Sequence, residues 1–569
     1  MVIGARMRNI LWQASAATSA LALASFLGYL APEAQAAQGG TPGAPFTHQY
    51  FNGVIGPLTQ RGDGTVGEST YKNPPSPICT LATSSAGNVN TDCEGTAPHN
   101  ETSIAVNPAN PLNLLGGLND YQLRLSSGGH VGETIFTRAH VSFDGGKTWA
   151  MYPIPYNGYT ATGDPAAAFD ASGNAYMATL GFGFSQGASL PNQNADILVA
   201  HSTDGGKTWD TVRVASGSGV LTGPGIFNDK EYITAWGNGN VIVTWTQFNL
   251  AKGGSYISSP IFDAVSHDGG NTWTAPQEIS GSAPFCLGAT ASAPTACDQS
   301  QGSVPVVAAD GSIYVAFENT YNIDPASLAF GADQYLVVKV DPATGGRTAG
   351  PFLVSHLVDG GYDYPINVDG RQTYQDSQFR TWSVGNIAAD PTNPAHLAVV
   401  WSDMRNSPLP SSPSAFNPDP NSVTTNSDIV VSQSTDGGQT WSAPAAIKEP
   451  GDQFMPWAVY DSTGRLHIGY FDRSYDPANH AYGYTLATEQ SPGSLTFTRT
   501  EVTTTLSDPT QGTRWFSGGV INHATTFLGD YTGIAAIPGG GIAAFWTDMR
   551  NTVCFTVRCG SGQDAFYAS

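Results

Sequence analysis

One octet, Ser-x-Asp-Gly-Gly-x-Thr-Trp, occurs four times in this chain and constrains its fold more than any other feature. The copies span 142–149, 202–209, 266–273 and 434–441. An aspartate followed by two glycines is typical of a tight turn, since its carboxylate accepts backbone N–H groups and glycine adopts positive φ readily. Apolar, strand-like segments flank each copy. We therefore predict four hairpin turns anchored by a buried Trp, with a structural role for the aspartates Asp144, Asp204, Asp268 and Asp436.

The octet resembles the Asp-box, or BNR repeat, of the sialidase superfamily of β-propellers. In that family it occupies the turn between the third and fourth strands of a blade, on the face away from the active site. The resemblance covers roughly residues 100–569. It implies an all-β chain folded as a propeller, and a secreted glycoside hydrolase acting on a terminal sugar, such as sialic acid.

From about residue 100 the chain can be divided into seven units of three or four strands, the last of them one strand short. A propeller closes its ring when the other terminus completes the final blade. The octets begin at 142, 202, 266 and 434, so the last interval of 168 residues spans two enlarged units. We predict seven blades over 99–569; six blades, as in the family's catalytic domains, is the alternative.

The segments before the propeller have a different composition. Residues 1–36 are typical of a secretory signal, with Arg6 and Arg8 before an apolar run and an Ala-Gln-Ala cleavage site at 34–36. A membrane anchor is the alternative interpretation, and no later stretch is long and apolar enough to span a bilayer. Residues 37–98 are predicted to be an irregular extension that lends one strand, 47–51, to the ring.

Charge and cysteines fit an exported protein, extracellular or periplasmic. The chain has 23 Lys and Arg against 45 Asp and Glu, a formal charge of −22, which disfavours nucleic acid and anionic membranes as partners. Six cysteines lie in local pairs without zinc-site spacing, so we predict three disulfides in an oxidising compartment. The predicted pairs are Cys79–Cys93, Cys286–Cys297 and Cys554–Cys559.

Polar residues recur where one face of a propeller would be. The corners after second strands carry Glu318, Arg405, Arg473 and Arg550, and the segments leading into first strands carry Asp164, Asp229, Glu231 and Tyr531. Because these corners and segments share the channel mouth, we predict a site there. The alternative for the two Asp-Met-Arg-Asn corners, at Arg405 and Arg550, is an Asp–Arg pair that only closes a hairpin.

The resemblance suggests roles for these residues. Sialidases bind the substrate carboxylate with three arginines and use a tyrosine nucleophile with a glutamate partner, as an exception among glycosidases. By this analogy Tyr531 is the candidate nucleophile, Glu231 its partner, and Asp164 or Asp229 the acid. Arg405, Arg473 and Arg550, with Glu318, are candidates for substrate binding. The family's Arg-Ile-Pro motif is missing.

Two functions therefore remain open, a glycoside hydrolase and a non-catalytic propeller that binds a glycan or a protein at the cell surface. The expected partner is a carbohydrate or glycoconjugate. No cofactor is required by either. An acidic, aromatic loop at 359–370 could hold Ca²⁺.

Overall fold

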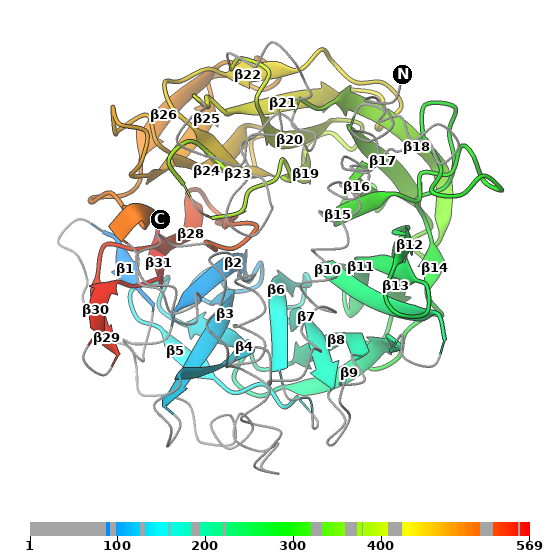
Figure 1. Ribbon diagram of the computed structural model, residues 1–569, viewed down its shortest axis with the longest axis horizontal. Helices are drawn as coiled ribbons and strands as arrows, with labels where there is room; N and C mark the ends of the chain where they lie inside the picture. Colours follow the sequence, from blue (N-terminus) through cyan, green and yellow to red (C-terminus); the bar gives the residue numbers. More distant parts are fainter. Residues whose placement is uncertain are drawn as a thin grey trace, which may run out of the picture.

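Seven antiparallel sheets, six with four strands and one with five, form a ring around a central channel (Figure 1). The computed structural model describes residues 87–91, 98–125, 131–156, 159, 161–183, 194–219, 223–319, 333–358, 373–377, 379–407, 424–511, 527–555 and 558–569. Within these residues the chain is almost entirely β. The predicted seven-bladed β-propeller is confirmed, and the six-bladed alternative is wrong.

Blades 1 to 6 are each built from strands that follow one another along the chain, and the first strand of every blade lies nearest the channel (Figure 1). Blades 1 to 3 contain β2 (His99–Val106), β3 (Leu114–Leu125), β4 (Val131–Ser142) and β5 (Ala150–Tyr152); β6 (Ala161–Phe169), β7 (Ala175–Gly183), β8 (Asn194–Ser202) and β9 (Asp210–Ala215); and β10 (Gly225–Trp236), β11 (Asn240–Leu250), β13 (Ile261–Ser266) and β14 (Gln277–Glu278), with β12 (Tyr256–Ser258) beside β11.

Blades 4 to 7 continue the ring. They contain β15 (Ser300–Val307), β16 (Ile313–Asn319), β17 (Gln334–Val340) and β18 (Arg347–His356); β19 (Asn386–Ala389), β20 (Leu397–Asp403), β21 (Asp428–Ser434) and β22 (Ala445–Ile447); β23 (Gln453–Tyr460), β24 (Leu466–Asp472), β25 (Gly483–Glu489) and β26 (Phe497–Glu501); and β27 (Gly533–Ala536), β28 (Ile542–Asp548) and β31 (Asp564–Ala568). A small hairpin, β29 (Thr552–Phe555) and β30 (Arg558–Ser561), and a 3₁₀ turn, η4 (Pro509–Gln511), lie outside these sheets.

The ring closes through the N-terminal side of the chain. Strand β1 (Val89–Asn90) pairs with β31 and becomes the fourth strand of blade 7. The backbone N–H of Thr91 then donates to the carbonyl of Ala565 at 2.9 Å. The prediction that the other terminus completes the last blade is confirmed, with Val89–Asn90 as the closing strand. The segment 47–51, and the predicted signal 1–36, lie outside the described residues.

The four octets adopt one turn, between the third and fourth strands of blades 1, 2, 3 and 5. In the first copy, Asp144 accepts the backbone N–H of Thr148 at 2.9 Å and its hydroxyl at 2.6 Å. The Trp149 indole N–H donates to the Gly146 carbonyl at 3.0 Å, and its ring is buried against Phe545 of blade 7. Each octet therefore closes its own hairpin, and in this copy the Trp also joins adjacent blades.

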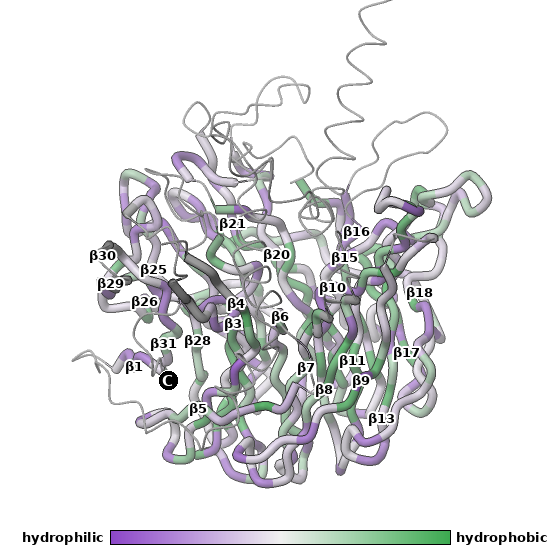
Figure 2. The backbone as a smooth tube through the Cα atoms, turned by 60° about the horizontal axis from the view of Figure 1, so that its bottom comes forward, coloured by the Kyte–Doolittle hydropathy of each residue, from purple (hydrophilic) through white to green (hydrophobic). Residues whose placement is uncertain are grey.

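The core lies between the blades, where apolar faces of neighbouring sheets pack together. Figure 2 shows hydrophobic strands in the wall of the ring and hydrophilic turns at its ends. The indoles of Trp245, Trp401 and Trp546 are fully buried there. In the part of the chain that the structure describes, no helix has the length and apolar character needed to cross a membrane.

One predicted disulfide is formed within the described side chains. Cys286 and Cys297 are bonded, which staples the loop between blades 3 and 4. Cys554 and Cys559 stand opposite each other in the β29–β30 backbone pairing. Cys79 and Cys93 lie outside the described residues.

Candidate active site at the centre of the ring

A β-bulge recurs at one depth in the first strands of five blades. The pairing register shifts at this point in β2, β6, β10, β15 and β23. Each bulge contains a residue with positive φ: Glu101, Asp164, Lys230, Gly302 and Met455. Positive φ is uncommon for residues other than glycine, and a bulge re-aims the side chain that it carries. In blades 1 to 3 the re-aimed side chains are charged.

These three charged side chains meet at the centre of the ring. Lys230 Nζ lies 3.3 Å from Glu101 Oε1 and 2.8 Å from Asp164 Oδ2. It also lies 2.6 Å from Oδ2 of Asp530, which precedes the first strand of blade 7. Lys230 therefore joins four of the seven blades, and we call Lys230 with the carboxylates around it the hub.

A second cation reaches the hub from outside the first strands. Arg380 Nε donates to Asp530 Oδ1 at 2.7 Å, and a terminal guanidinium nitrogen binds Oδ2 of the same carboxylate. The Trp382 indole N–H donates to the Asp530 carbonyl at 3.2 Å. The Arg380 guanidinium stacks on the Phe527 ring at 4.4 Å. Asp530 is thus clamped between Lys230 and Arg380.

Burial and charge divide the carboxyl groups into two kinds. Burial favours the neutral form of Asp530, but Arg380 and Lys230 outweigh it and hold its pKa below the ordinary value. Burial, reinforced by Asp164, raises the pKa of Glu101 well above its usual range. Although burial opposes it, the surrounding carboxylates raise the pKa of Lys230. The pKa values of these two neighbouring carboxyl groups are therefore shifted in opposite directions, that of Asp530 downward and that of Glu101 upward.

Glu231, next to the hub lysine, is the least satisfied carboxyl group of the site. Its side chain is 2% exposed, and neither carboxyl oxygen has a hydrogen-bond partner among the described residues. Burial and the nearby charge of Asp164 raise its pKa well above the ordinary value. Burial likewise raises the pKa of Asp229 to about 7. Burial therefore favours the neutral form of Glu231.

Tyr531 belongs to an aromatic layer that spans the channel. Its ring lies 6.3 Å from Tyr232 and 6.4 Å from Trp457, and those two rings, from blades 3 and 6, are 4.8 Å apart. The Tyr531 hydroxyl donates to the Pro165 carbonyl at 3.0 Å. Burial, with the negative charges of Glu101 and Asp164, raises its pKa well above the usual value. The Tyr531 phenol therefore stays protonated, and its hydroxyl is committed to the hydrogen bond with Pro165.

The predicted residues thus fall into two groups. The structure brings Asp164, Asp229, Glu231 and Tyr531 together around Lys230. It does not bring the three arginines together. Arg405 and Arg550 each fold onto the aspartate of their own corner, at 2.5 Å from Asp403 and 2.6 Å from Asp548. Each aspartate also accepts the indole N–H of a buried Trp, so these two arginines close their hairpins, as the alternative interpretation proposed.

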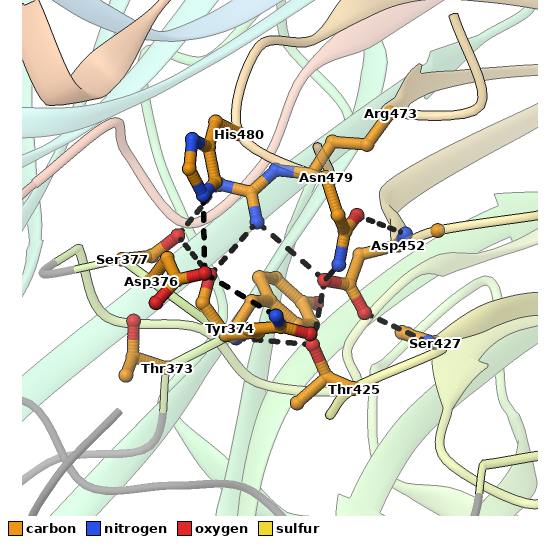
Figure 3. A network of polar contacts seen from close by, with 12 residues as sticks. Thr373, Tyr374, Asp376, Ser377, Thr425, Ser427, Asp452, Arg473, Asn479 and His480 are labelled. Atoms are coloured by element: carbon orange, nitrogen blue, oxygen red, sulfur yellow. Dashed lines mark hydrogen bonds and ion pairs between the residues drawn. The ribbon is translucent and has the colours of Figure 1, made fainter. Parts of the chain in front are cut away.

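Arg473 differs from the other two because it is fully buried. Its guanidinium donates to Ser377 Oγ at 2.6 Å and lies 3.5 Å from Asp452 (Figure 3). Glu318, also fully buried, is the next-to-last residue of β16 in blade 4. Burial raises the pKa of Tyr335, and the charge of Glu318 adds to this effect. The hypothesis that Arg405, Arg473 and Arg550 clamp one substrate carboxylate is therefore not supported.

Metal binding gains no support from the residues whose side chains are described, because they include no group of three or more His, Cys, Asp or Glu arranged to hold an ion. The acidic loop 359–370 lies outside the described residues.

Sequence reasoning missed the two cations of the hub. Lys230 stands among the polar residues leading into a first strand, and its central place follows from the bulge, which no periodic pattern reveals. Arg380 lies in an insertion without repeat character.

No family model matches the chain, and no curated protein matches it. Solved structures with a similar arrangement include a protein of unknown function from Dyadobacter fermentans (12% identity, TM-score 0.42, covering 86% of this chain and 98% of that one). Others are an α-L-arabinanase of Penicillium chrysogenum (12%, 0.39, 85% and 98%) and the NanB sialidase of Streptococcus pneumoniae (8%, 0.38, 87% and 99%). None of these similarities assigns an activity to this chain.

Proposed function

We propose that this protein is a secreted glycoside hydrolase whose active site is the charged hub at the centre of the propeller. The observation that carries the proposal is Glu231, a buried carboxyl group beside a cluster of carboxylates, whose two oxygens have no hydrogen-bond partner among the described residues. Burial raises its pKa and favours its neutral form. Glycosidases commonly pair a carboxylic acid of raised pKa with a second, ionised carboxylate. The hub provides both kinds of group.

Glu231 suits the role of general acid. A proton donor must remain protonated at the working pH and release its proton to the glycosidic oxygen as the bond breaks. The carboxyl oxygens of Glu231 are not committed to any described partner, so they can turn to a substrate oxygen without breaking an existing hydrogen bond.

Asp164 suits the role of the second carboxylate. Its side chain is 15% exposed, whereas those of Glu101 and Asp530 are 1% and 5% exposed. It is therefore the most exposed of the three carboxylates that contact Lys230. Lys230, at 2.8 Å, fixes its orientation. Asp164 either activates a water molecule or attacks the anomeric carbon, and the configuration of the product distinguishes the two.

The charge of the site favours a neutral sugar. Five carboxyl groups, Glu101, Asp164, Asp229, Glu231 and Asp530, surround two cations, which are already paired with carboxylates. The three corner arginines are engaged elsewhere. A sugar carboxylate would therefore lack a free guanidinium partner, and the Tyr531 phenol is held in a protonated form unsuited to a nucleophile.

Turnover of fluorogenic glycosides by the mature protein tests this proposal. The panel contains neutral hexosides, neutral pentosides and a sialoside. We expect hydrolysis of a neutral glycoside, a loss of at least about a hundredfold in Asp164→Asn, a loss in Glu231→Gln that grows as the leaving group becomes poorer, and retained activity in Tyr531→Phe. Glu501→Gln, an exposed residue of blade 6, is the matched control. Sialoside turnover abolished by Tyr531→Phe would instead support the sialidase-like mechanism.

A non-catalytic glycan-binding propeller is the second candidate. It is favoured by the ion pairing of the hub, since Lys230 already occupies Asp164, the carboxylate that a hydrolase would use as its nucleophile or base. A folded protein that binds an immobilised glycan array and hydrolyses no member of the panel would support this candidate over the first.

A further inference from the structure

A short segment connects blades 4 and 5 in sequence but contacts blades 6 and 7 across the channel face of the ring. We define the crossing segment as the described residues 373–377 and 379–382. In sequence it lies between β18 and β19, the last strand of blade 4 and the first of blade 5. Its described contacts, however, reach blades 6 and 7, through Arg473 and Asp530.

The middle of the crossing segment is fixed by Arg473. The guanidinium donates to Ser377 Oγ at 2.6 Å and to the Gln375 carbonyl at 3.4 Å. Three rings surround it, those of Tyr374, Phe379 and Phe454, with its central carbon 5.4 to 5.8 Å from their centres. A fully buried guanidinium with these partners holds the segment at one position (Figure 3).

Asp452, the ion-pair partner of Arg473, is itself fixed by hydrogen bonds. Its carboxylate accepts hydrogen bonds from Thr425 Oγ1 at 2.7 Å, Asn479 Nδ2 at 2.7 Å and the backbone N–H of Ser427 at 2.9 Å. The backbone N–H of Gln375 donates to the same Thr425 hydroxyl at 3.0 Å. At the outer edge, His480 lies 3.0 Å from Asp376 (Figure 3). The crossing segment is therefore bound to blades 5 and 6 by a buried polar network.

At its C-terminal end the crossing segment places two side chains, Arg380 and Trp382, against Asp530 of the hub. Thr381 Oγ1 donates to the Tyr374 hydroxyl at 2.6 Å, which ties the residue after Arg380 to the anchored part. Arg380 and Trp382, on either side of Thr381, both contact Asp530. The position of the Arg380 guanidinium thus depends on the anchor at Arg473.

We infer that Arg473 is a positioning residue for the active site: it holds the crossing segment so that Arg380 and Trp382 fix Asp530 against Lys230. This inference rests on the proposed function. Arg473 itself is fully buried and contacts the segment, so it acts through Arg380 and not on a substrate.

A double-mutant cycle tests the inference. Arg473→Met and Arg380→Met are each expected to lower kcat at least about tenfold, and the double variant to be no slower than the slower single variant. Both should also move the acid limb of the kcat profile to higher pH, because Asp530 loses the guanidinium that lowers its pKa. The groups facing Asp530 are Arg380, Lys230, Glu101, Asp164 and Asp229.

The control is Arg499→Met in β26 of blade 6, whose guanidinium pairs with Asp472 of the same blade and with Glu449 of the connection from blade 5. This variant should leave kcat within about twofold. Ser377→Ala removes one bond to Arg473 and provides a milder second variant if Arg473→Met does not fold. Additive effects of Arg473→Met and Arg380→Met, or an unchanged pH profile in a folded Ser377→Ala protein, would overturn the inference.

Hydrogen exchange separates this inference from the proposed function. In Arg473→Met and in Ser377→Ala, the amides of 379–386 and 527–532 should exchange at least about tenfold faster, while those of blade 2 are unchanged. If these amides exchange faster in the variants but the wild-type protein has no hydrolase activity, the anchoring of the crossing segment by Arg473 stands and the proposed function is rejected. Unchanged exchange in both variants would reject the anchoring.

Discussion

Lys230→Met is the substitution that most directly tests the hub as a joint between blades. The change keeps a long apolar side chain and removes the charge that Glu101, Asp164 and Asp530 share. Breaking a buried ion pair by removing one partner typically costs about 3–5 kcal/mol, because the other partner is left buried and unpaired. Arg380 remains beside Asp530, so we expect a loss near the lower end of that range.

The expected loss can be expressed as a change in melting temperature. The entropy of unfolding is about 2 cal/mol/K per residue, or about 1 kcal/mol/K for a propeller of roughly 480 residues. A loss of about 3–5 kcal/mol then lowers Tm by about 3–5 °C. Differential scanning calorimetry at pH 7.5 measures this, with Lys147→Met, an exposed lysine of the first octet, as a control expected within about 1 °C.

The same comparison at lower pH sharpens the test. The pKa of Lys230 is raised in the folded protein, so its contribution is fully present below the unfolded value of about 10.4 and is lost only as pH rises through the folded value. In the variant the carboxyl groups repel each other until they are protonated. The Tm gap between wild type and variant should therefore narrow from pH 7.5 to pH 4.5. A gap below about 1 °C at pH 7.5, or one that widens on acidification, would refute the reasoning.

Three further predictions concern the scaffold. Burial raises the pKa of Asp263 to about 7, so this carboxyl group destabilises the fold as pH rises from about 4 through 7. Over that range the stability of Asp263→Asn should gain about 2–4 kcal/mol relative to wild type. A difference in Tm between the two proteins that does not vary with pH would contradict this. Asp204→Ala removes the acceptor for Thr208 and Lys207 in the second octet and should lower stability by about 1–3 kcal/mol, measured as a Tm decrease; an unchanged Tm would show that the turn does not need its carboxylate. Replacing Cys286 and Cys297 by alanine opens a loop of 11 residues and should cost about 2–3 kcal/mol, with added reductant having no effect on the variant's Tm.

The fold was predictable because its information is local and repeated. The octets specify a turn through Asp144 and its equivalents, and the recurring strand units give the number of blades. Blade 4 lacks an octet, yet the interval of 168 residues between the third and fourth copies was correctly read as two steps from one blade to the next. The closing strand was harder to locate, since Val89–Asn90 is only two residues long and carries no pattern.

The site was predictable in position but not in its pairings. Segments leading into first strands share one face in any propeller, so Asp164, Glu231 and Tyr531 could be grouped without coordinates. Which charges meet depends on bulges and on an insertion. Lys230 reaches the centre because its backbone adopts positive φ, and Arg380 arrives by way of Arg473. Arg405 and Arg550 looked equally suited to an anion, but an aspartate two residues away satisfies each of them.

The dependence of turnover on the leaving group tests the central claim most directly. A general acid matters for a poor leaving group and becomes dispensable for a good one, because the latter departs without a proton. We predict that Glu231→Gln lowers kcat/KM at least about a hundredfold for an alkyl glycoside of the preferred sugar, and less than about tenfold for the 2,4-dinitrophenyl glycoside. An equal loss for both substrates, or no loss for either, would contradict the assignment of Glu231 as the proton donor at the centre of this propeller.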